Sequence, residues 1–455
     1  MTQDSRKRTL HPAQIVVIAF GAAVLLGTLL LLLPISTTSG ESTDLVTALF
    51  TSVSAVCLTG LTVVETGTYW SSFGHLVIML LIQVGGLGIV AFATLVGLLI
   101  AGRISLRDRM NTITEAKIIG IDSMPALLRT IMLVYFGFEA ALAVFLAARL
   151  HLTYDFATLD AIWYGLFHAI SAFNNGGFSL FVGSMTMFAS DLFIIAPVMI
   201  AVIVGGLGFP VLIEIHERLW NLHPQANGKP RRFSLHSRLT LGTSGVLLLL
   251  GTLFIYLLEA DNPKTLGSMN IFEQIWNAMF MATMTRSGGL NSIDMSELDH
   301  ATWLGMDLLM FIGGGSASTA GGIKVTTVAI LIFIIYTEIR GETAVNVGNR
   351  RLPRSIQRQA LTLVALYATV VIISTLFLAA TTKFSLDSLL FEVISASATV
   401  GLSTGITAEL PDFAKVWLSV LMFIGRLGPV VVASALALRV TKRHYELSKE
   451  RPLIG

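Results

Sequence analysis

Apolar residues fall into long runs along this chain, and short connections between the runs hold most of the polar residues. The first run, residues 14–34, is long enough to cross a hydrocarbon layer of about 30 Å as a helix. The pattern therefore predicts an all-α membrane protein with eight spanning helices, of which the sixth is interrupted. The other seven runs lie at 76–101, 130–148, 190–213, 239–258, 303–337, 360–380 and 416–438.

Composition agrees with a membrane protein. Hydrophobic residues make up 54% of the chain and charged residues 13%, whereas soluble domains carry about 25% charged residues. The single cysteine, Cys57, excludes an intramolecular disulfide and a cysteine-based zinc cluster. No motif for nucleotide hydrolysis occurs in the sequence, so we expect no enzymatic activity and no cofactor bound by this chain.

Lysine and arginine are distributed unevenly among the connections. Of 30 basic residues, 23 lie in the N-terminal segment, in 102–129, 217–238 and 339–358, and in the tail from 439. Basic loops stay cytoplasmic, so we expect a multi-pass protein of the plasma membrane with both termini inside. The alternate connections are acidic, which either keeps them soluble or raises the cation concentration at an outer mouth.

One short motif recurs four times at nearly constant spacing. Its glycine anchors are separated by 117, 112 and 112 residues, and a second glycine-rich stretch follows each anchor after 24 to 28 residues. An internal repeat explains this register. The anchors, each with the residues ten and six positions before it, are Gly60 (Phe50, Ser54), Gly177 (Phe167, Ser171), Gly289 (Met279, Thr283) and Gly401 (Phe391, Ser395).

Each copy contains a spanning helix, a short segment that ends at the anchor, and a second spanning helix (M1-P-M2). The short segments, of about 12–15 residues, are too short to span and indicate re-entrant half-helices. Asp44 and Asp160 stand where they could cap two of them. Because two crossings return the chain to the same side, the four copies are parallel and can surround one pseudo-fourfold axis. The predicted units are 1–101, 102–217, 218–338 and 339–438, followed by a cytoplasmic tail, 439–455.

This arrangement suits a monovalent cation. Four half-helices would direct their C-terminal ends, each with about half a negative charge, toward the axis. Glycine after each helix permits dihedral angles that aim carbonyl oxygens inward, and rings of carbonyls can replace a hydration shell. Taken singly, each glycine fits close helix packing equally well, but four glycines in register favour the carbonyl ring.

The four anchor segments, together with "SAFNNGGF" (171–178) and "GGGSASTAGGIKVTT" (313–327), resemble the Ktr/Trk/HKT potassium-uptake superfamily, and most closely its KtrB-type membrane subunits. The resemblance covers essentially the whole chain. It implies potassium (K+) translocation through one filter, with the anchors as filter glycines. The implied filter residues are Leu58, Thr59, Gly60, Asn175, Gly176, Gly177, Ser287, Gly288, Gly289, Thr399, Val400 and Gly401.

The interrupted sixth span contains "GGGSASTAGG" (313–322), which is rich in residues that disfavour a helix. This stretch is either a flexible kink at a tight helix crossing or a gating loop beneath the filter. The fourth copy carries Arg426 where the first two copies have glycine. The resemblance implies that this arginine is an electrostatic gate, and a structural clamp on carbonyls is the alternative. The implied gate comprises Gly313, Gly314, Gly315, Ser316, Ala317, Ser318, Thr319 and Arg426.

Further polar residues lie close to the anchors. Arg286 precedes Gly289 by three residues, and a cation there would oppose cation flow unless it pointed behind the filter. We expect a structural ion pair with Glu392, with Asp294 as the second choice. The side chains of Asn174 and Asn175 either line the filter or bond neighbouring backbone, and asparagine chemistry favours the second role.

The resemblance further implies a homodimer in the lipid bilayer on a cytosolic, nucleotide-binding KtrA-type ring, without nucleic acid. Uptake would be driven by the electrochemical gradient, with sodium (Na+) as a possible coupling or activating ion. A Trk-type symporter with another partner, a passive cation channel and the membrane subunit of an ATP-driven pump remain alternatives. A non-transporting receptor would leave the glycine register without a purpose.

Overall fold

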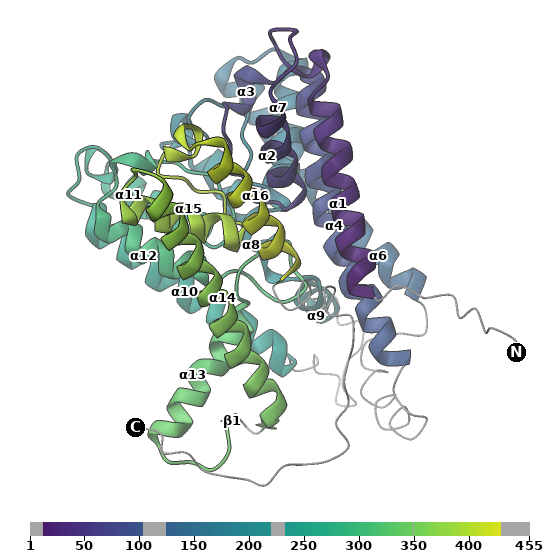
Figure 1. The fold of residues 1–455 in the computed structure, drawn as a ribbon, viewed down its shortest axis with the longest axis vertical. Coiled ribbons are helices and arrows are strands. Elements are labelled where there is room, and N and C mark those ends of the chain that lie inside the picture. Colours follow the sequence, from purple (N-terminus) through teal and green to yellow (C-terminus); the bar gives the residue numbers. More distant parts are fainter. Residues whose placement is uncertain (1–11, 103–123, 220–232, 349, 429–455) are drawn as a thin grey trace, which may run out of the picture.

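The computed structural model describes residues 12–102, 124–219, 233–348 and 350–428, which form a helical molecule (Figure 1). A long helix, a short buried helix and a further helix follow one another four times along the described chain. The groups are α1 (Pro12–Leu31), α2 (Leu45–Val56) and α4 (Ser72–Gly102); α6 (Met124–Tyr154), α7 (Thr158–Phe173), α8 (Leu192–Leu207) and α9 (Phe209–Leu219); α10 (Leu235–Glu259), α11 (Ile271–Met284), α12 (His300–Phe311) and α13 (Val325–Ile339); and α14 (Arg354–Thr381), α15 (Leu386–Ala398) and α16 (Asp412–Leu427).

The first helix of each group is apolar and long enough to cross a membrane. These stretches are Gln14–Leu31, Met132–Tyr154, Leu235–Glu259 and Arg354–Thr381. In addition, α8 and α9 are together long and apolar enough to span, as a bent pair. Their outer faces expose large apolar side chains, such as Leu25 at 64% and Leu29 at 63%. A soluble protein would bury such a stripe, whereas lipid tails cover it without cost.

The short helices α2, α7, α11 and α15 each contribute several buried residues to the hydrophobic core. Phe50, Phe167 and Phe391, which stand ten residues before three of the anchors, are fully buried. Asp44 caps α2 as expected, because its carboxylate accepts a hydrogen bond from the amide of Thr47. The expected cap at Asp160 is wrong: α7 begins at Thr158, so Asp160 lies inside its first turn.

Two of the expected spans are broken. The break between α12 and α13 was expected, and residues 312–324 there are not helical. The break between α8 and α9, with a bend of 106°, was not expected, because we treated 190–213 as one continuous helix. Its cause is local: Pro210 has no N–H for the carbonyl of Gly206, and Gly208 adopts a positive φ of 94°. The equivalent stretch of α4 has no proline and stays helical.

Short elements complete the described chain. The strands β1 (Asn346–Val347) and β2 (Arg350–Arg351) form an antiparallel hairpin that follows α13 and was not expected. The others are α3 (Thr66–Tyr69) and the 3-10 turns η1 (Pro34–Ser36), η2 (Thr186–Phe188), η3 (Leu266–Ser268), η4 (Met295–Glu297) and η5 (Ile406–Glu409). Much of the expected basic connection 102–129, the C-terminal part of the last span and the tail 439–455 lie outside the described residues.

Candidate functional site

Each short helix ends just before its anchor glycine in the same unusual backbone geometry. The residue two positions before each anchor has a positive φ, between 50° and 129°, although none of the four is glycine. The anchor itself also has a positive φ, between 69° and 98°. Non-glycine residues in this region cost free energy and cluster at functional sites. The residues with the shared strain are Leu58, Asn175, Ser287 and Thr399.

In three of the four units this geometry is a helix-ending motif with a hydrogen bond across six residues. The amide one position before the anchor donates to the carbonyl six positions before it, in Thr59–Ser54 (2.8 Å), Gly176–Ser171 (2.6 Å) and Val400–Ser395 (2.9 Å). Unit three differs, because Gly288 donates to Met284 instead. The chain therefore turns sharply at the end of each helix and leads directly into the anchor.

The serines six residues before the anchors secure these turns. The hydroxyl oxygen of Ser54 accepts a hydrogen bond from the amide of Gly60 (3.0 Å), and Ser395 does the same for Gly401 (3.1 Å). Ser171 instead donates to the carbonyl of Phe178 at 2.7 Å. The register seen in the sequence thus has a structural cause, because a hydroxyl at this position fixes the backbone around the glycine.

The four anchor glycines meet at one constriction. A Cβ atom placed on Gly177 would lie 2.9 Å from the Cα of Gly60 and 3.2 Å from the Cα of Gly289. A Cβ on Gly289 would lie 2.5 Å from the carbonyl oxygen of Val400, and one on Gly401 would lie 3.0 Å from the Cα of Gly60. Units one to four are therefore neighbours in cyclic order. Glycine is required here for its left-handed backbone and for the space itself.

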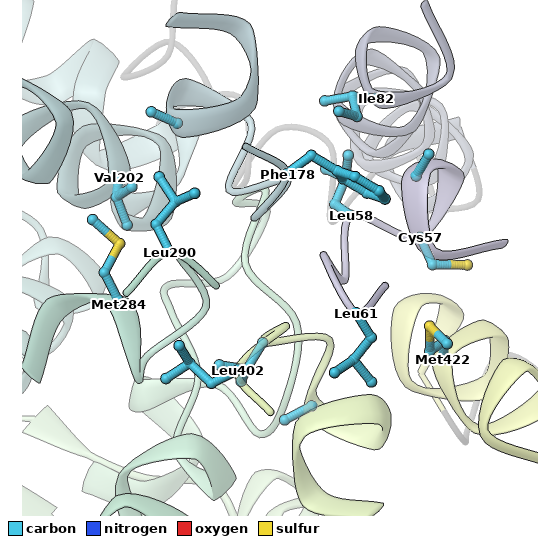
Figure 2. Close-up of a cluster of buried hydrophobic side chains, with 14 of the residues drawn as sticks. Cys57, Leu58, Leu61, Ile82, Phe178, Val202, Met284, Leu290, Leu402 and Met422 are labelled. Atoms are coloured by element: carbon cyan, nitrogen blue, oxygen red, sulfur yellow. The ribbon is translucent and has the colours of Figure 1, made fainter. Parts of the chain in front are cut away.

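Apolar side chains immediately after the glycines surround the constriction. Leu61, Phe178, Leu290 and Leu402 each follow an anchor, and each is at most 1% exposed. Figure 2 shows these four side chains, from four separate chain segments, placed in turn around a common centre. They anchor the strained backbone in the hydrophobic core.

A cavity of about 280 Å³ lies on the side of the constriction toward the residues that follow the glycines. We call this cavity the vestibule. All four anchors line it, together with the residue two positions after each anchor. Two carboxylates, Glu65 and Asp294, also line it, and each stands five residues after its glycine. The vestibule is therefore polar and carries negative charge.

Residues 312–324 pack on the other side of the constriction. Thr319 donates to the side-chain oxygen of Asn175 (3.3 Å), and the amide of Gly321 donates to the hydroxyl of Ser287 (3.3 Å). Both acceptors stand two residues before an anchor. The stretch expected to form a gate thus packs against residues that directly precede the constriction. Its ends are paired through the amide of Gly313 and the carbonyl of Ile323 (2.9 Å).

Arg426 lies at the end of α16, 6% exposed, and holds this loop. Its guanidinium donates to the carbonyl of Thr319 in the loop and to the carbonyl of Gly85 in α4 (3.4 Å). The contacts that we expected of a carbonyl clamp are therefore present. Lys324, to which we assigned no role, donates its Nζ to the carbonyl of Ala320 at 2.6 Å.

The expected ion pair between Arg286 and Glu392 is wrong, since both lie in the described chain and bind elsewhere. Arg286 donates to the carbonyl and the hydroxyl of Ser244 in α10 (3.2 and 3.1 Å) and to the carbonyl of Gly313 (3.4 Å). Glu392 accepts hydrogen bonds from hydroxyl and amide groups that follow Gly401. Asp294, the second choice, caps η4. These oxygens accept from the two terminal nitrogens of the buried guanidinium, while its Nε has no partner in the described chain. Sequence distance alone did not indicate α10.

Asn174 and Asn175 have different roles. Asn174 points into a buried polar cluster behind the constriction, where its amide donates to Glu139 (2.8 Å), Gln83 (3.3 Å) and the carbonyl of Ile170 (2.9 Å). Tyr135 donates to the side-chain oxygen of Asn174. Asn175 contacts the loop, as described above. Its contact was not predicted, because it depends on a loop that lies 144 residues later in the chain.

Two buried hydroxyls near the constriction accept or donate no hydrogen bond within the described part of the chain. They belong to Thr59, one residue before an anchor, and Thr399, two residues before another. An orphaned buried hydroxyl costs about 1–3 kcal/mol unless an ion or a water meets it. Their position beside four converging carbonyl-bearing segments fits a path for a cation.

Comparisons with known proteins agree with one another. Residues 2–442 match the TrkH family model, described as a cation transport protein. The chain is 36% identical to Ktr system potassium uptake protein B of Bacillus subtilis (strain 168), over 94% of this chain and 93% of that protein. It is 33% identical to the potassium/sodium uptake protein NtpJ of Enterococcus hirae, over 100% of this chain and 99% of that protein. The fold is similar to the crystal structure of the potassium transporter TrkH from Vibrio parahaemolyticus, with a TM-score of 0.72 and 20% identity. The match covers 96% of this chain and 87% of that chain.

Proposed function

This chain belongs to the TrkH family of cation transport proteins, and we propose that it is the ion-translocating subunit of a potassium-uptake system. The observation that carries the proposal is the constriction at which Gly60, Gly177, Gly289 and Gly401 meet without room for a Cβ atom. A dehydrated potassium ion requires oxygen ligands from several directions, and four backbone segments that converge on one centre supply them. Relatives of nearly full-length coverage carry potassium uptake in their names.

The proposed architecture is four parallel M1-P-M2 units around a pseudo-fourfold axis through the constriction. The cyclic order of neighbouring glycines supports it, as does the recurrence of a long, a short and a further helix. The units would correspond to residues 1–101, 102–217, 218–338 and 339–438. The filter would consist of the three residues that end at each anchor, with carbonyl oxygens rather than carboxylates as ligands.

We further propose that residues 313–319 and Arg426 form the gate. Two features support this role: the loop contacts the strained residues Asn175 and Ser287, and Arg426 ties the loop to α4. In this position the loop occludes the path of the ion until it withdraws. The charge on Arg426 adds an electrostatic barrier to a cation at the same depth.

The protein would lie in the plasma membrane with the vestibule outside and both termini in the cytoplasm. The distribution of basic residues supports this orientation. The chain would form a homodimer on a cytosolic, nucleotide-binding ring of the KtrA type, and the ring would regulate it. Two relatives that are named as proteins of a Ktr system support this assembly. The membrane potential, about 2.3 kcal/mol per charge per 100 mV, would drive uptake.

A second form of this function is uptake coupled to or stimulated by sodium. The relative from Enterococcus hirae, named as a potassium/sodium uptake protein and matched over its full length, favours it. A sodium-coupled symporter and a passive channel differ in one measurable respect, because only the former has a potassium flux that depends on sodium.

The test is uptake of radioactive rubidium, a potassium analogue, by proteoliposomes that contain the full-length chain. We expect accumulation driven by an inside-negative potential, competition by potassium, and little competition by choline. Uptake no faster than into protein-free liposomes would refute potassium translocation. Repeating the measurement with and without sodium on the outside separates the two forms.

A further inference from the structure

The residues two positions after the anchors share a property that the sequence register did not reveal. All four carry a side-chain oxygen, all four line the vestibule, and all four are half-buried. They stand directly after the apolar residues that surround the constriction. The four residues, which we call the vestibule ring, are Thr62, Ser179, Asn291 and Ser403.

In units two and four, a side chain nine residues before the anchor holds the ring residue. Glu392 accepts hydrogen bonds from the hydroxyl of Ser403 (2.5 Å) and the amide of Thr404 (3.1 Å). His168 occupies the equivalent position and contacts the hydroxyl of Ser179 (3.1 Å) and the amide of Leu180 (3.2 Å) through Nε2. Two chemically different residues thus perform the same task at the same register.

The hydrogen-bond partners determine how these two hydroxyls point. Nδ1 of His168 faces the carbonyl of Tyr164 at 2.7 Å and must carry the ring hydrogen, so Nε2 of the neutral ring accepts. The hydroxyl of Ser179 lies 3.1 Å from Nε2 and 3.5 Å from the carbonyl of Phe181, so it donates its hydrogen to the nearer acceptor, Nε2, which also accepts from the amide of Leu180. Ser403 donates its own to the carboxylate of Glu392. Each hydroxyl oxygen also accepts a hydrogen bond from an amide two residues later, Ser179 from Phe181 (3.0 Å) and Ser403 from Gly405 (2.9 Å), so one lone pair of each oxygen is left for a ligand in the vestibule.

The other two ring residues also leave an oxygen available. Asn291 uses its amide nitrogen on the carbonyl of Ile293 at 2.9 Å. Neither its side-chain oxygen nor the hydroxyl of Thr62 accepts a hydrogen bond from any residue that the structure describes. Units one and three instead add Glu65 and Asp294 at the wall of the same cavity. Acceptor oxygens and negative charge therefore converge, with no basic side chain among the lining residues.

We propose that the vestibule ring is a second cation site, outside the glycine constriction, that binds a partly hydrated monovalent cation. His168 and Glu392 are positioning residues that orient two of its four oxygens. Neutral oxygen donors in a roomy cavity suit an alkali-metal ion, and the described residues contain no group of three His, Cys, Asp or Glu that would favour a divalent metal. The site deepens the proposed potassium uptake and rests on it, because it would load the filter.

The first test removes the oxygens. The double variant Ser179→Ala/Ser403→Ala should raise the KM for rubidium uptake about tenfold and change the maximal rate by less than about threefold, since two ligands of the loading site are lost. The control is Thr51→Val, at the position in unit one that corresponds to His168, where the structure records no hydrogen bond to the vestibule segment. An unchanged KM in the double variant, with normal uptake by the parent chain, would overturn the inference and leave the proposed function standing.

The second test separates positioning from packing. Glu392→Gln keeps an acceptor and should retain a KM near that of the parent chain, whereas Glu392→Leu should show the raised KM. A KM for Glu392→Leu that equals that of Glu392→Gln would contradict the positioning role.

The third test needs no transport. Amide hydrogen exchange in the parent chain should slow across residues 178–181 and 402–405 when potassium replaces choline in the buffer. The Ser179→Ala/Ser403→Ala chain should lose this protection. Absence of potassium-dependent protection in the parent chain refutes the vestibule site even if uptake fails, and its presence supports the site on its own.

Discussion

Substitutions of Arg426 distinguish between a gate that acts by charge and one that acts by holding a loop. Arg426→Ala removes the donors to the carbonyls of Thr319 and Gly85. A hydrogen bond from a charged group contributes about 1.5–3 kcal/mol, and the longer bond to Gly85 contributes less. If this free energy keeps the loop shut, its loss shifts the opening equilibrium by about 10- to 100-fold.

The assay is rubidium uptake by proteoliposomes at matched protein content. We expect Arg426→Ala to raise the uptake rate, at most by the same factor of about 10 to 100 by which the opening equilibrium shifts. Arg426→Lys, which keeps the charge, should stay close to the parent chain, and Arg426→Gln should behave like alanine. Lys415→Ala is the matched control, since it removes a positive charge from the same helix eleven residues earlier.

Two results would refute parts of this reasoning. If Arg426→Gln retains the low parental rate, the clamp on the carbonyls matters and the charge does not. If all three substitutions leave the rate and the KM unchanged in well-folded protein, Arg426 has no part in gating.

Three further changes have defined outcomes. Gly177→Ala should abolish rubidium uptake, because its Cβ would lie 2.9 Å from the Cα of the anchor Gly60, whereas Gly242→Ala, which meets no atom within 4 Å, should not. Deletion of Gly314 through Ala317 should raise uptake and reduce its response to a regulator, and loss of folding without a gain in flux would count against a gate. Asp44→Ala should lower the free energy of unfolding by about 1 kcal/mol through loss of the cap on α2, measured by thermal unfolding in detergent. Burial alone would raise the pKa of the Asp44 carboxyl, but the hydrogen bonds that it accepts hold this pKa below its ordinary value. The contribution of the cap to stability is therefore complete at neutral pH and is lost as the pH falls through the lowered pKa. Equal melting temperatures of the parent and Asp44→Ala chains at pH 7 would contradict this prediction.

Much of the helical pattern could be predicted from the sequence, because it depends on local chemistry. Long apolar runs, the interruption at 313–322 and the register around Gly60 and its equivalents all reflect requirements within a few residues. The break after Gly208 was also local, and the proline two residues later was an available signal that we did not use. The equivalent stretch near Gly85 lacks that proline and stays helical.

Side-chain contacts outside the repeated register could not be predicted in the same way. Arg286 binds Ser244, which lies 42 residues earlier in the chain on a helix that the register does not connect with it. The roles of His168 and Glu392 were hidden for another reason. The two side chains, an imidazole and a carboxylate, differ chemically, so no sequence pattern links them. Only the positions of their hydrogen-bond partners show that the two residues are equivalent.

The paired breaks in α8 and the loop have a mechanical consequence. The carbonyls of Gly205 and Gly206, at the broken end of α8, accept hydrogen bonds from the amides of Thr319 (3.3 Å) and Gly315 (2.8 Å), and Phe209 returns one to the carbonyl of Ala317 (3.2 Å). In the proposed opening, withdrawal of the loop would break these three hydrogen bonds together, and continuation of α8 into α9 would pair the amide of Phe209 with the carbonyl of Gly205. The loop and the helix would then change together, so the proposed gate would switch between two states rather than open gradually.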